Sequence, residues 1–205
     1  MNKPKFHSFF ELASESSGHF TIEHAQRGSE LIILTPHGGG IEPGTSEVVK
    51  ALAGQHISYY CFEGIRQDGN DALHITSTRF DEPVGRSMAA NAETVLAVHG
   101  CGDKKERLYL GGLNEEWIAH FLSAFQEAGF PAERGFGHIS GKSPRNICNL
   151  GRKRKGIQFE LSEGLRRKMF LGLDHQGRQH QTALFDQFVE VGKTVINSSI
   201  PALDL

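Results

Sequence analysis

The segment 31–47 limits the possible folds of this chain more than any other stretch of its sequence. Its first residues, 31–34, are all apolar, and such a run is typical of a strand that is buried on both faces, as in a parallel sheet. A Thr-Pro pair ends the run, and residues 37–42 (His-Gly-Gly-Gly-Ile-Glu) follow. The sequence then indicates an amphipathic helix over about 44–53. This order predicts one unit of an α/β fold with polar side chains at the carboxyl end of a strand, where open α/β sheets bind ligands.

Other segments continue the same alternation along the chain. Apolar or alternating residues predict strands at 20–27, 57–62, 72–76, 94–98 and 157–161. Helical spacing and capping residues predict helices at 4–13, 87–91, 114–128 and 183–196. Strands that alternate with helices indicate an α/β fold, and 205 residues fit one domain. We therefore expect a single domain, residues 1–205, in which helices flank a mixed, mostly parallel sheet.

Composition excludes several classes of protein. A hydrophobic fraction of 38% argues for a folded core, and a net charge of −2 argues against a general nucleic-acid binder. We find neither an apolar run long enough for a membrane span nor an N-terminal signal peptide. The three cysteines lack C-x-x-C spacing, which disfavours a disulfide scaffold or a structural zinc finger. We expect synthesis in the cytoplasm, no membrane partner and a monomeric protein.

Two of the predicted strands are followed by histidine and glycine. His37 follows the strand 31–34, and His99 follows the strand 94–98. If the two strands are parallel, both histidines lie at the same edge of the sheet, and the glycine turn lets Glu42 close on them. Three protein ligands with one open position are typical of catalytic zinc sites. The sequence therefore predicts a Zn²⁺ site formed by His37, Glu42 and His99.

Plainer interpretations exist for each of these residues. The glycine turn is also compatible with His37 simply packing, or with a loop that binds an anion at a helix start. The chain has neither of the common nucleotide-binding glycine motifs at this point. His99 on its own would be a strand-end histidine bonded to the backbone. His74 and His138 are spare histidines that would replace a ligand or bind a substrate.

Glu160 is the candidate general base. It lies in the apolar strand 157–161, where an ionisable group is costly unless it has a partner. Alternation places it on one strand face with Gln158, opposite Phe159. Apolar surroundings favour a raised pKa, which suits proton transfer near neutral pH. The alternative is a solvent-facing residue on an edge strand.

Arginines are candidates for holding an acidic substrate. Arg145, beside a proline turn, would pair with a carboxylate, and Arg79 would do the same or stabilise an oxyanion. Arg66 and the basic runs 152–155 and 166–168 add positive charge that would attract a polyanion. For most of these residues the alternative is a solvated turn or helix face.

Five motifs resemble those of the phage-type poly-γ-glutamate hydrolase family. They are HGGGIEPGTSE at 37–47, HITS at 74–77, VHG at 98–100, NICN at 146–149 and QFELS at 158–162. The family is similar in fold to zinc carboxypeptidases, with a mixed sheet between helices and one zinc ion. The resemblance implies endo-cleavage of γ-amide bonds in poly-γ-glutamate, the capsule polymer of some bacilli. It also implies a phage or Bacillus origin, with release on host lysis.

The resemblance also assigns roles to individual residues. His37, Glu42 and His99 match the zinc ligands, Glu160 matches the general base, and Arg145 resembles the arginine that binds a carboxylate. One spacing departs from zinc carboxypeptidases, whose first two ligands follow H-x-x-E, whereas this chain has H-x-x-x-x-E. The likeness to carboxypeptidases therefore rests on fold and chemistry.

These observations predict a zinc-dependent hydrolase of poly-γ-glutamate. Glu160 and Arg79 are its expected catalytic residues, and Arg145, Arg66 and His74 are expected to bind substrate. Two alternatives remain. One is a zinc amidohydrolase or carboxypeptidase that acts on small acyl- or γ-glutamyl-amino acids, and the other is a polyanion-binding protein without catalytic activity.

Overall fold

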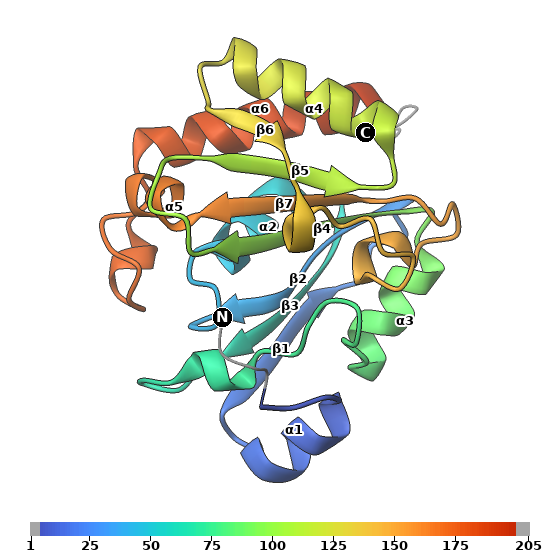
Figure 1. The fold of residues 1–205 in the computed structure, drawn as a ribbon, viewed down its shortest axis with the longest axis vertical. Helices are drawn as coiled ribbons and strands as arrows, with labels where there is room; N and C mark the ends of the chain where they lie inside the picture. The colour runs from blue at the N-terminus through green and yellow to red at the C-terminus, as the bar shows by residue number, and fades with distance from the viewer. Residues whose placement is uncertain (1–4, 200–205) are drawn as a thin grey trace.

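The computed structural model of the protein describes residues 5–199, and a seven-stranded mixed sheet runs through its centre (Figure 1). In spatial order the strands are β1 (Phe20–Ala25), β3 (Ser58–Gly64), β2 (Leu31–Gly39), β4 (Thr94–Cys101), β7 (Ile157–Ser162), β5 (Leu108–Gly112) and β6 (Ala132–Arg134). The central strands β3, β2, β4 and β7 are parallel to one another, whereas β1 and β5 run antiparallel to β3 and β7. The expected mixed, mostly parallel sheet is confirmed.

Helices cover both faces of this sheet, as the sequence predicts for a single α/β domain. One face packs against α2 (Thr45–Ala53), α4 (Glu115–Glu127), α5 (Glu163–Met169) and α6 (Ala183–Ser199). The other face packs against α1 (Phe9–Ser16) and α3 (Pro83–Asn91). Short 3-10 helices lie at Asn70–Leu73, Gly137–Ile139, Ile147–Asn149 and Gly177–Gln179.

Strand β2 is buried along its whole length. Leu31 and Ile33 point into the core beneath α2, α4 and α6, while Ile32 and Leu34 point into the core on the opposite face. Because side chains alternate along a strand, a strand covered on both faces needs an unbroken apolar run. The sheet thus explains why residues 31–34 contain no polar side chain.

Phenylalanines dominate the core between the sheet and α4. The ring of Phe159 on β7 lies 4.9 Å from that of Phe121 and 5.9 Å from that of Phe125, both edge-on. Phe188 of α6 lies 4.6 Å from Phe125. Edge-on and offset arrangements of this kind add to the stability gained from burial alone. They hold β7 firmly against the helices, and the helix predicted at 114–128 is confirmed as α4.

The predicted strand at 72–76 is wrong. The 3-10 helix Asn70–Leu73 occupies its first part, and the chain then continues without regular structure. Leu73 and Ile75 are both buried, so the alternation that suggested a strand reflects real burial. The carbonyl of Ile75, however, interacts with a ring nitrogen of His37 instead of a neighbouring strand.

Three elements, β5, β6 and α5, were not predicted. Strand β5 ends in two glycines and β6 has only three residues, so neither shows a clear alternating pattern. Helix α5 starts directly where β7 ends, and the side chain of Ser162 caps it by accepting from the amide of Leu165. Two predicted helices begin elsewhere, α1 at Phe9 and α3 at Pro83. Pro4, the predicted start of the first helix, lies outside the described residues.

Candidate metal centre

The glycine turn at the end of β2 folds Glu42 back beside His37. Gly39 has a φ of +62°, and a Cβ at this position would lie 2.5 Å from the carbonyl oxygen of Gly64 on β3. Only glycine tolerates this conformation and this close approach without strain. The amide of Glu42 then donates to the carbonyl of His37 at 2.9 Å. The turn therefore places a histidine and a carboxylate next to each other at the edge of the sheet.

His99 reaches the same edge because β4 lies beside β2 and runs parallel to it. The Nδ1 atoms of His37 and His99 are 3.1 Å apart. Glu42 Oε1 lies 3.0 Å from Nδ1 of His37, and Glu42 Oε2 lies 3.5 Å from Nδ1 of His99. Two ligands of a tetrahedral zinc ion, each about 2.0–2.1 Å from the metal, are about 3.3 Å apart. The three donor atoms are thus spaced as zinc ligands are.

The contacts behind this group fix which ring atoms face inward. Nε2 of His37 lies 2.6 Å from the carbonyl of Ile75, which only accepts hydrogen bonds, so Nε2 carries the proton and the neutral ring keeps its lone pair on Nδ1. Nε2 of His99 lies 3.3 Å from the hydroxyl of Ser77. Such outer partners typically orient histidine ligands of metals.

The donor set therefore fits a cation. The lone pair of His37 Nδ1 faces a carboxylate oxygen of Glu42, and two acceptors at this distance need a proton or a metal ion between them. Burial raises the pKa of Glu42, but coulombic attraction to a protonated His37 and hydrogen bonds from His37, His74 and His99 together outweigh burial and hold that pKa well below its usual range. His37, Glu42 and His99 are also the group whose ligand atoms lie within 4.8 Å of one another in the part of the chain that the structure describes.

His74 lies against this group. Its ring stacks on the ring of His37, with 3.9 Å between centroids, and its Nε2 atom lies 3.6 Å from Oε1 of Glu42. The side chain is half-buried. The structure thus brings His74 beside the predicted ligands, at a position open enough to meet a substrate.

Glu160 lies beside His99, because β7 pairs with β4 and the two residues are partners in the register. Its side chain is 8% exposed, and its strand is interior to the sheet, so a solvent-facing position on an edge strand is excluded. The amide of Gln158 donates to Oε1 of Glu160 at 2.9 Å, and Asn146 donates to Gln158 at 2.8 Å. Burial and the charge of Glu42 raise the pKa of Glu160 well above its usual range, against the opposing charge of Arg166.

The comparison with known families agrees with this geometry. The model of the poly-gamma-glutamate hydrolase family matches residues 6–191. The chain belongs to this family. Membership makes the protein a hydrolase, and it confirms the resemblance found in the motifs.

Individual relatives match nearly the whole chain. YndL of Bacillus subtilis (strain 168) is 37% identical over 191 residues, which are 91% of this chain and 75% of YndL. A zinc-free structure of YndL has a TM-score of 0.93 and 35% identity, and covers 97% of this chain and 100% of YndL's. The structure of a bacteriophage poly-gamma-glutamate hydrolase matches with a TM-score of 0.92 and 29% identity, and the match covers 96% of this chain and 98% of the bacteriophage chain.

The fold extends beyond the family. N-formylglutamate amidohydrolase from Ralstonia eutropha JMP134 is 11% identical, with a TM-score of 0.53 over 86% of this chain and 95% of its own. At this identity the likeness concerns the fold alone. Within residues 5–199 of this chain, no helix has both the length and the apolar character that a membrane crossing requires.

The structure does not bring the predicted arginines into contact with the three candidate ligands. Arg66 donates to the hydroxyl of Ser16 at 3.0 Å and so braces a loop. Arg79 is exposed, and its guanidinium lies 2.8 Å from a ring nitrogen of His7. Arg145 is exposed, and within residues 5–199 its guanidinium has no hydrogen-bond or ion-pair partner. Their roles stay predictions.

Arg166 is a buried residue near the site, although the sequence places it in the basic run 166–168. Its side chain is 5% exposed, and its guanidinium donates to main-chain carbonyls. A signal was present in the sequence, because Leu165 and Met169 are apolar at a spacing of four and Arg166 falls on the same inward face of α5.

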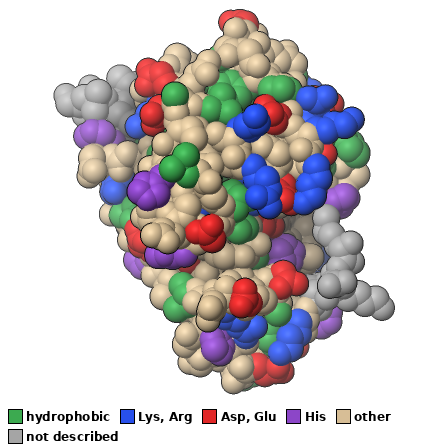
Figure 2. Space-filling view, turned by 90° about the vertical axis from the view of Figure 1, so that its left-hand side faces the viewer, with side chains coloured by type: hydrophobic (Ala, Val, Ile, Leu, Met, Phe, Trp, Pro, Cys, Tyr) green, Lys and Arg blue, Asp and Glu red, His purple; other side chains and the backbone are tan. Residues whose placement is uncertain are grey.

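The arrowheads of β2, β3, β4 and β7 point to the left in Figure 1, so the face drawn in Figure 2 is the one at their carboxyl ends. The middle of this face is hollowed, histidine side chains are visible there, and Lys and Arg side chains gather over one side.

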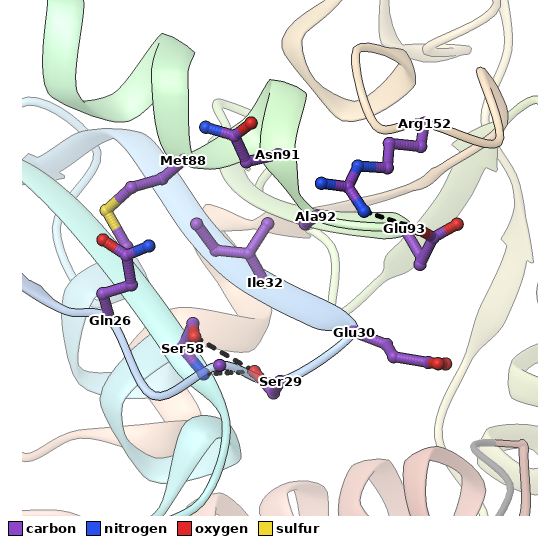
Figure 3. Close-up of a pocket in the computed structure, with 11 residues that line it drawn as sticks. Gln26, Ser29, Glu30, Ile32, Ser58, Met88, Asn91, Ala92, Glu93 and Arg152 are labelled. Carbon is purple, nitrogen blue, oxygen red and sulfur yellow. Dashed lines mark hydrogen bonds and ion pairs between the residues drawn. The ribbon is translucent and has the colours of Figure 1, made fainter.

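A separate cavity of about 450 Å³ lies near the amino-terminal ends of β2 and β4 and is drawn in Figure 3. Its lining includes Ser29, Glu93 and Arg152 but no histidine, so it is distinct from the candidate metal centre.

Proposed function

We propose that the protein is a zinc-dependent hydrolase that cleaves γ-glutamyl amide bonds within chains of poly-γ-glutamate. The observation that carries the proposal is the convergence of three acceptor atoms, from His37, Glu42 and His99, beside the buried carboxyl group of Glu160. Membership of the poly-gamma-glutamate hydrolase family supports the substrate. The zinc-free structure of YndL supports zinc as the metal.

His37, Glu42 and His99 would hold the zinc ion. When bound, zinc supplies Lewis acidity that polarises a carbonyl group and acidifies water. Glu160 would accept a proton from the attacking water and deliver it to the nitrogen of the leaving amine. Oε1 of Glu160 accepts the amide of Gln158, which leaves Oε2 to exchange the proton. The raised pKa of Glu160 suits both halves of this transfer near neutral pH.

The polymer offers a repeated recognition group. Every γ-linked glutamate displays a free α-carboxylate, and exposed cations next to the site would bind it. Arg145 is the best candidate, because its guanidinium is exposed and its proline turn restricts its position. His74 is half-buried beside Glu42 and would contact substrate at the zinc site. Arg79 would have to leave His7 to take part, and Arg66 would have to leave Ser16.

Purified protein incubated with poly-γ-glutamate tests the activity directly. We expect the mean chain length to fall early while little free glutamate is released, since internal bonds are cut. Removing zinc with a chelator should stop the reaction and adding zinc back should restore it. A γ-glutamyl dipeptide and an N-acyl glutamate serve as small substrates. Cleavage of these with unchanged polymer length would contradict the polymer assignment, and unchanged chain length at full zinc occupancy would do so as well.

Replacing the general base separates chemistry from metal binding. Glu160→Gln keeps the shape of the side chain but cannot accept a proton, so kcat should fall by about 10²–10⁴-fold. Zinc content should remain at the wild-type level because Glu160 is not a ligand. Glu190→Gln, on the exposed surface of α6, is the control and should leave kcat unchanged. Substantial turnover by Glu160→Gln would remove Glu160 from the mechanism.

A further inference from the structure

Arg166 occupies a position that is costly for a charged side chain. It lies in the last turn of α5 with 5% of its surface exposed. Burying a charge is unfavourable unless hydrogen bonds or an opposite charge compensate for it. Within residues 5–199 no carboxylate oxygen lies within 4.0 Å of its guanidinium nitrogens, so hydrogen bonds supply the direct compensation.

Those hydrogen bonds go to three different segments of main chain. Nε donates to the carbonyl of Leu161 at 3.1 Å, Nη1 to that of Pro43 at 2.8 Å, and Nη2 to that of Cys101 at 3.0 Å. Each carbonyl lies one or two residues after a residue of the candidate site. Leu161 follows Glu160, Pro43 follows Glu42, and Cys101 comes two residues after His99.

A glycine makes room for this arrangement. A Cβ at position 100 would lie 2.8 Å from the Cζ atom of Arg166. The amide of Gly100 itself donates to Oε2 of Glu42 at 2.8 Å. Gly100 therefore lies between the guanidinium and the carboxylate ligand, and contacts both. A rigid planar guanidinium holds three acceptors in fixed directions, which the single ammonium group of lysine does not do.

We propose that Arg166 is a positioning residue that fixes the spacing of the zinc ligands and the placement of Glu160. Its three hydrogen bonds tie the turn that carries Glu42 to the ends of β4 and β7. Because the guanidinium is buried and bonded to carbonyls, it acts through these segments and does not contact the substrate. The inference rests on the proposed zinc chemistry.

Arg166→Lys and Arg166→Met test this proposal. Disturbing groups that orient metal ligands typically costs 10–100-fold in metal affinity or activity. We expect the zinc dissociation constant, measured by competition with a chromophoric chelator, to rise by about 10–100-fold in both variants. At saturating zinc, kcat should fall while KM for the polymer stays close to the wild-type value.

Arg27 provides a matched control. Its Nη1 atom also donates to main-chain carbonyls, those of Gly54 and Ile57, at 2.8 and 2.7 Å, but at the amino-terminal end of β3. Arg27→Lys and Arg27→Met should lower the thermal midpoint without changing zinc affinity. All measurements are made well below the midpoint of each variant, so that loss of folded protein does not imitate loss of affinity.

Several results would overturn the proposal. One is a folded Arg166 variant with the zinc affinity and kcat of the wild type, and another is a raised KM with both of these unchanged, which would indicate a substrate contact. If Arg166→Met does not fold, Arg166→Lys decides alone, since it retains the charge. Failure of the proposed function would appear in the wild type, as zinc binding without polymer cleavage, whereas failure of this inference would appear only in the variants.

Discussion

The side chain of Gln158 joins two polar groups inside the sheet. Its amide nitrogen donates to Oε1 of Glu160 at 2.9 Å, while its oxygen accepts from Asn146 at 2.8 Å. A donor to a carboxylate stabilises the charged form, so its loss raises the carboxyl's pKa. Gln158→Leu should therefore shift the acidic limb of the kcat–pH profile of the proposed hydrolase to higher pH. It should also lower kcat by about tenfold or more, as expected for a lost hydrogen bond to a charged group.

Gln126→Leu is the control for this prediction. Gln126 on α4 donates to the carbonyl of Ala132 at 2.8 Å, far along the chain from Glu160. Its replacement should leave the kcat–pH profile where it is. A wild-type profile in Gln158→Leu would show that the amide does not influence the group that limits turnover at low pH.

The role of a residue was predictable where the sequence pattern determines which edge of the sheet its side chain reaches. His37 and His99 each lie at the carboxyl end of a buried parallel strand, so both had to reach the same edge. The arginines were different, because their partners come from segments distant in sequence. Arg66 meets Ser16, and Arg79 meets His7. No local sequence pattern predicts such contacts. Nor does one predict the hydrogen bonds from Arg166 to the carbonyls of Pro43, Cys101 and Leu161.

At the scale of elements, α4 is expected to contribute stability without affecting chemistry. Phe125 is fully buried among the rings of Phe130, Phe159 and Phe188. Phe125→Ala should lower the free energy of unfolding by about 3–5 kcal/mol, through lost burial and the cavity that remains. Chemical denaturation measures this change. Phe10→Ala, at a side chain that is 79% exposed, should change it by less than about 0.5 kcal/mol.

A second measurement tests the separation of α4 from the site. Zinc affinity and kcat of folded Phe125→Ala should match the wild type, because the ring lies behind β7 on the side facing the helices. A large loss of zinc affinity in this variant would mean that packing of the helix layer sets the ligand spacing, which would remove the special role of Arg166.

Helices and strands were predictable where the burial of one face spaces their apolar residues regularly along the sequence. The long helices α4 and α6 and the strands β2, β4 and β7 have a continuous apolar face, and each was found. Strands β5 and β6 were not: β5 is buried at all five residues and ends in two glycines, so it shows no alternation, and β6 has only three residues. The irregular segment around Ile75 imitated a strand, since alternate burial also occurs in loops that cover a core.

At the scale of the whole molecule, the candidate metal centre exists only in the folded chain. His37 and Glu42 come from the end of β2 and the turn after it, whereas His99 comes from the end of the adjacent parallel strand β4, more than fifty residues further along the chain (Figure 1). The unfolded chain does not hold His37, Glu42 and His99 at ligand spacing. A metal that binds only the folded form stabilises it by an amount that depends on the ratio of its concentration to the dissociation constant. Zinc binding should therefore be visible as thermal stability, independently of any substrate.

Free zinc at about 100 times its dissociation constant stabilises the folded form by about 2.7 kcal/mol. For a protein of this size the thermal midpoint should rise by about 5–10 °C, as measured by circular dichroism with and without chelator. His37→Ala should abolish the increase, because a two-ligand remnant binds zinc weakly. His56→Ala, an exposed histidine between α2 and β3, should retain it. An equal increase in His37→Ala would show that zinc stabilises the protein through other histidines, and the metal centre assigned to β2 and β4 would then be wrong.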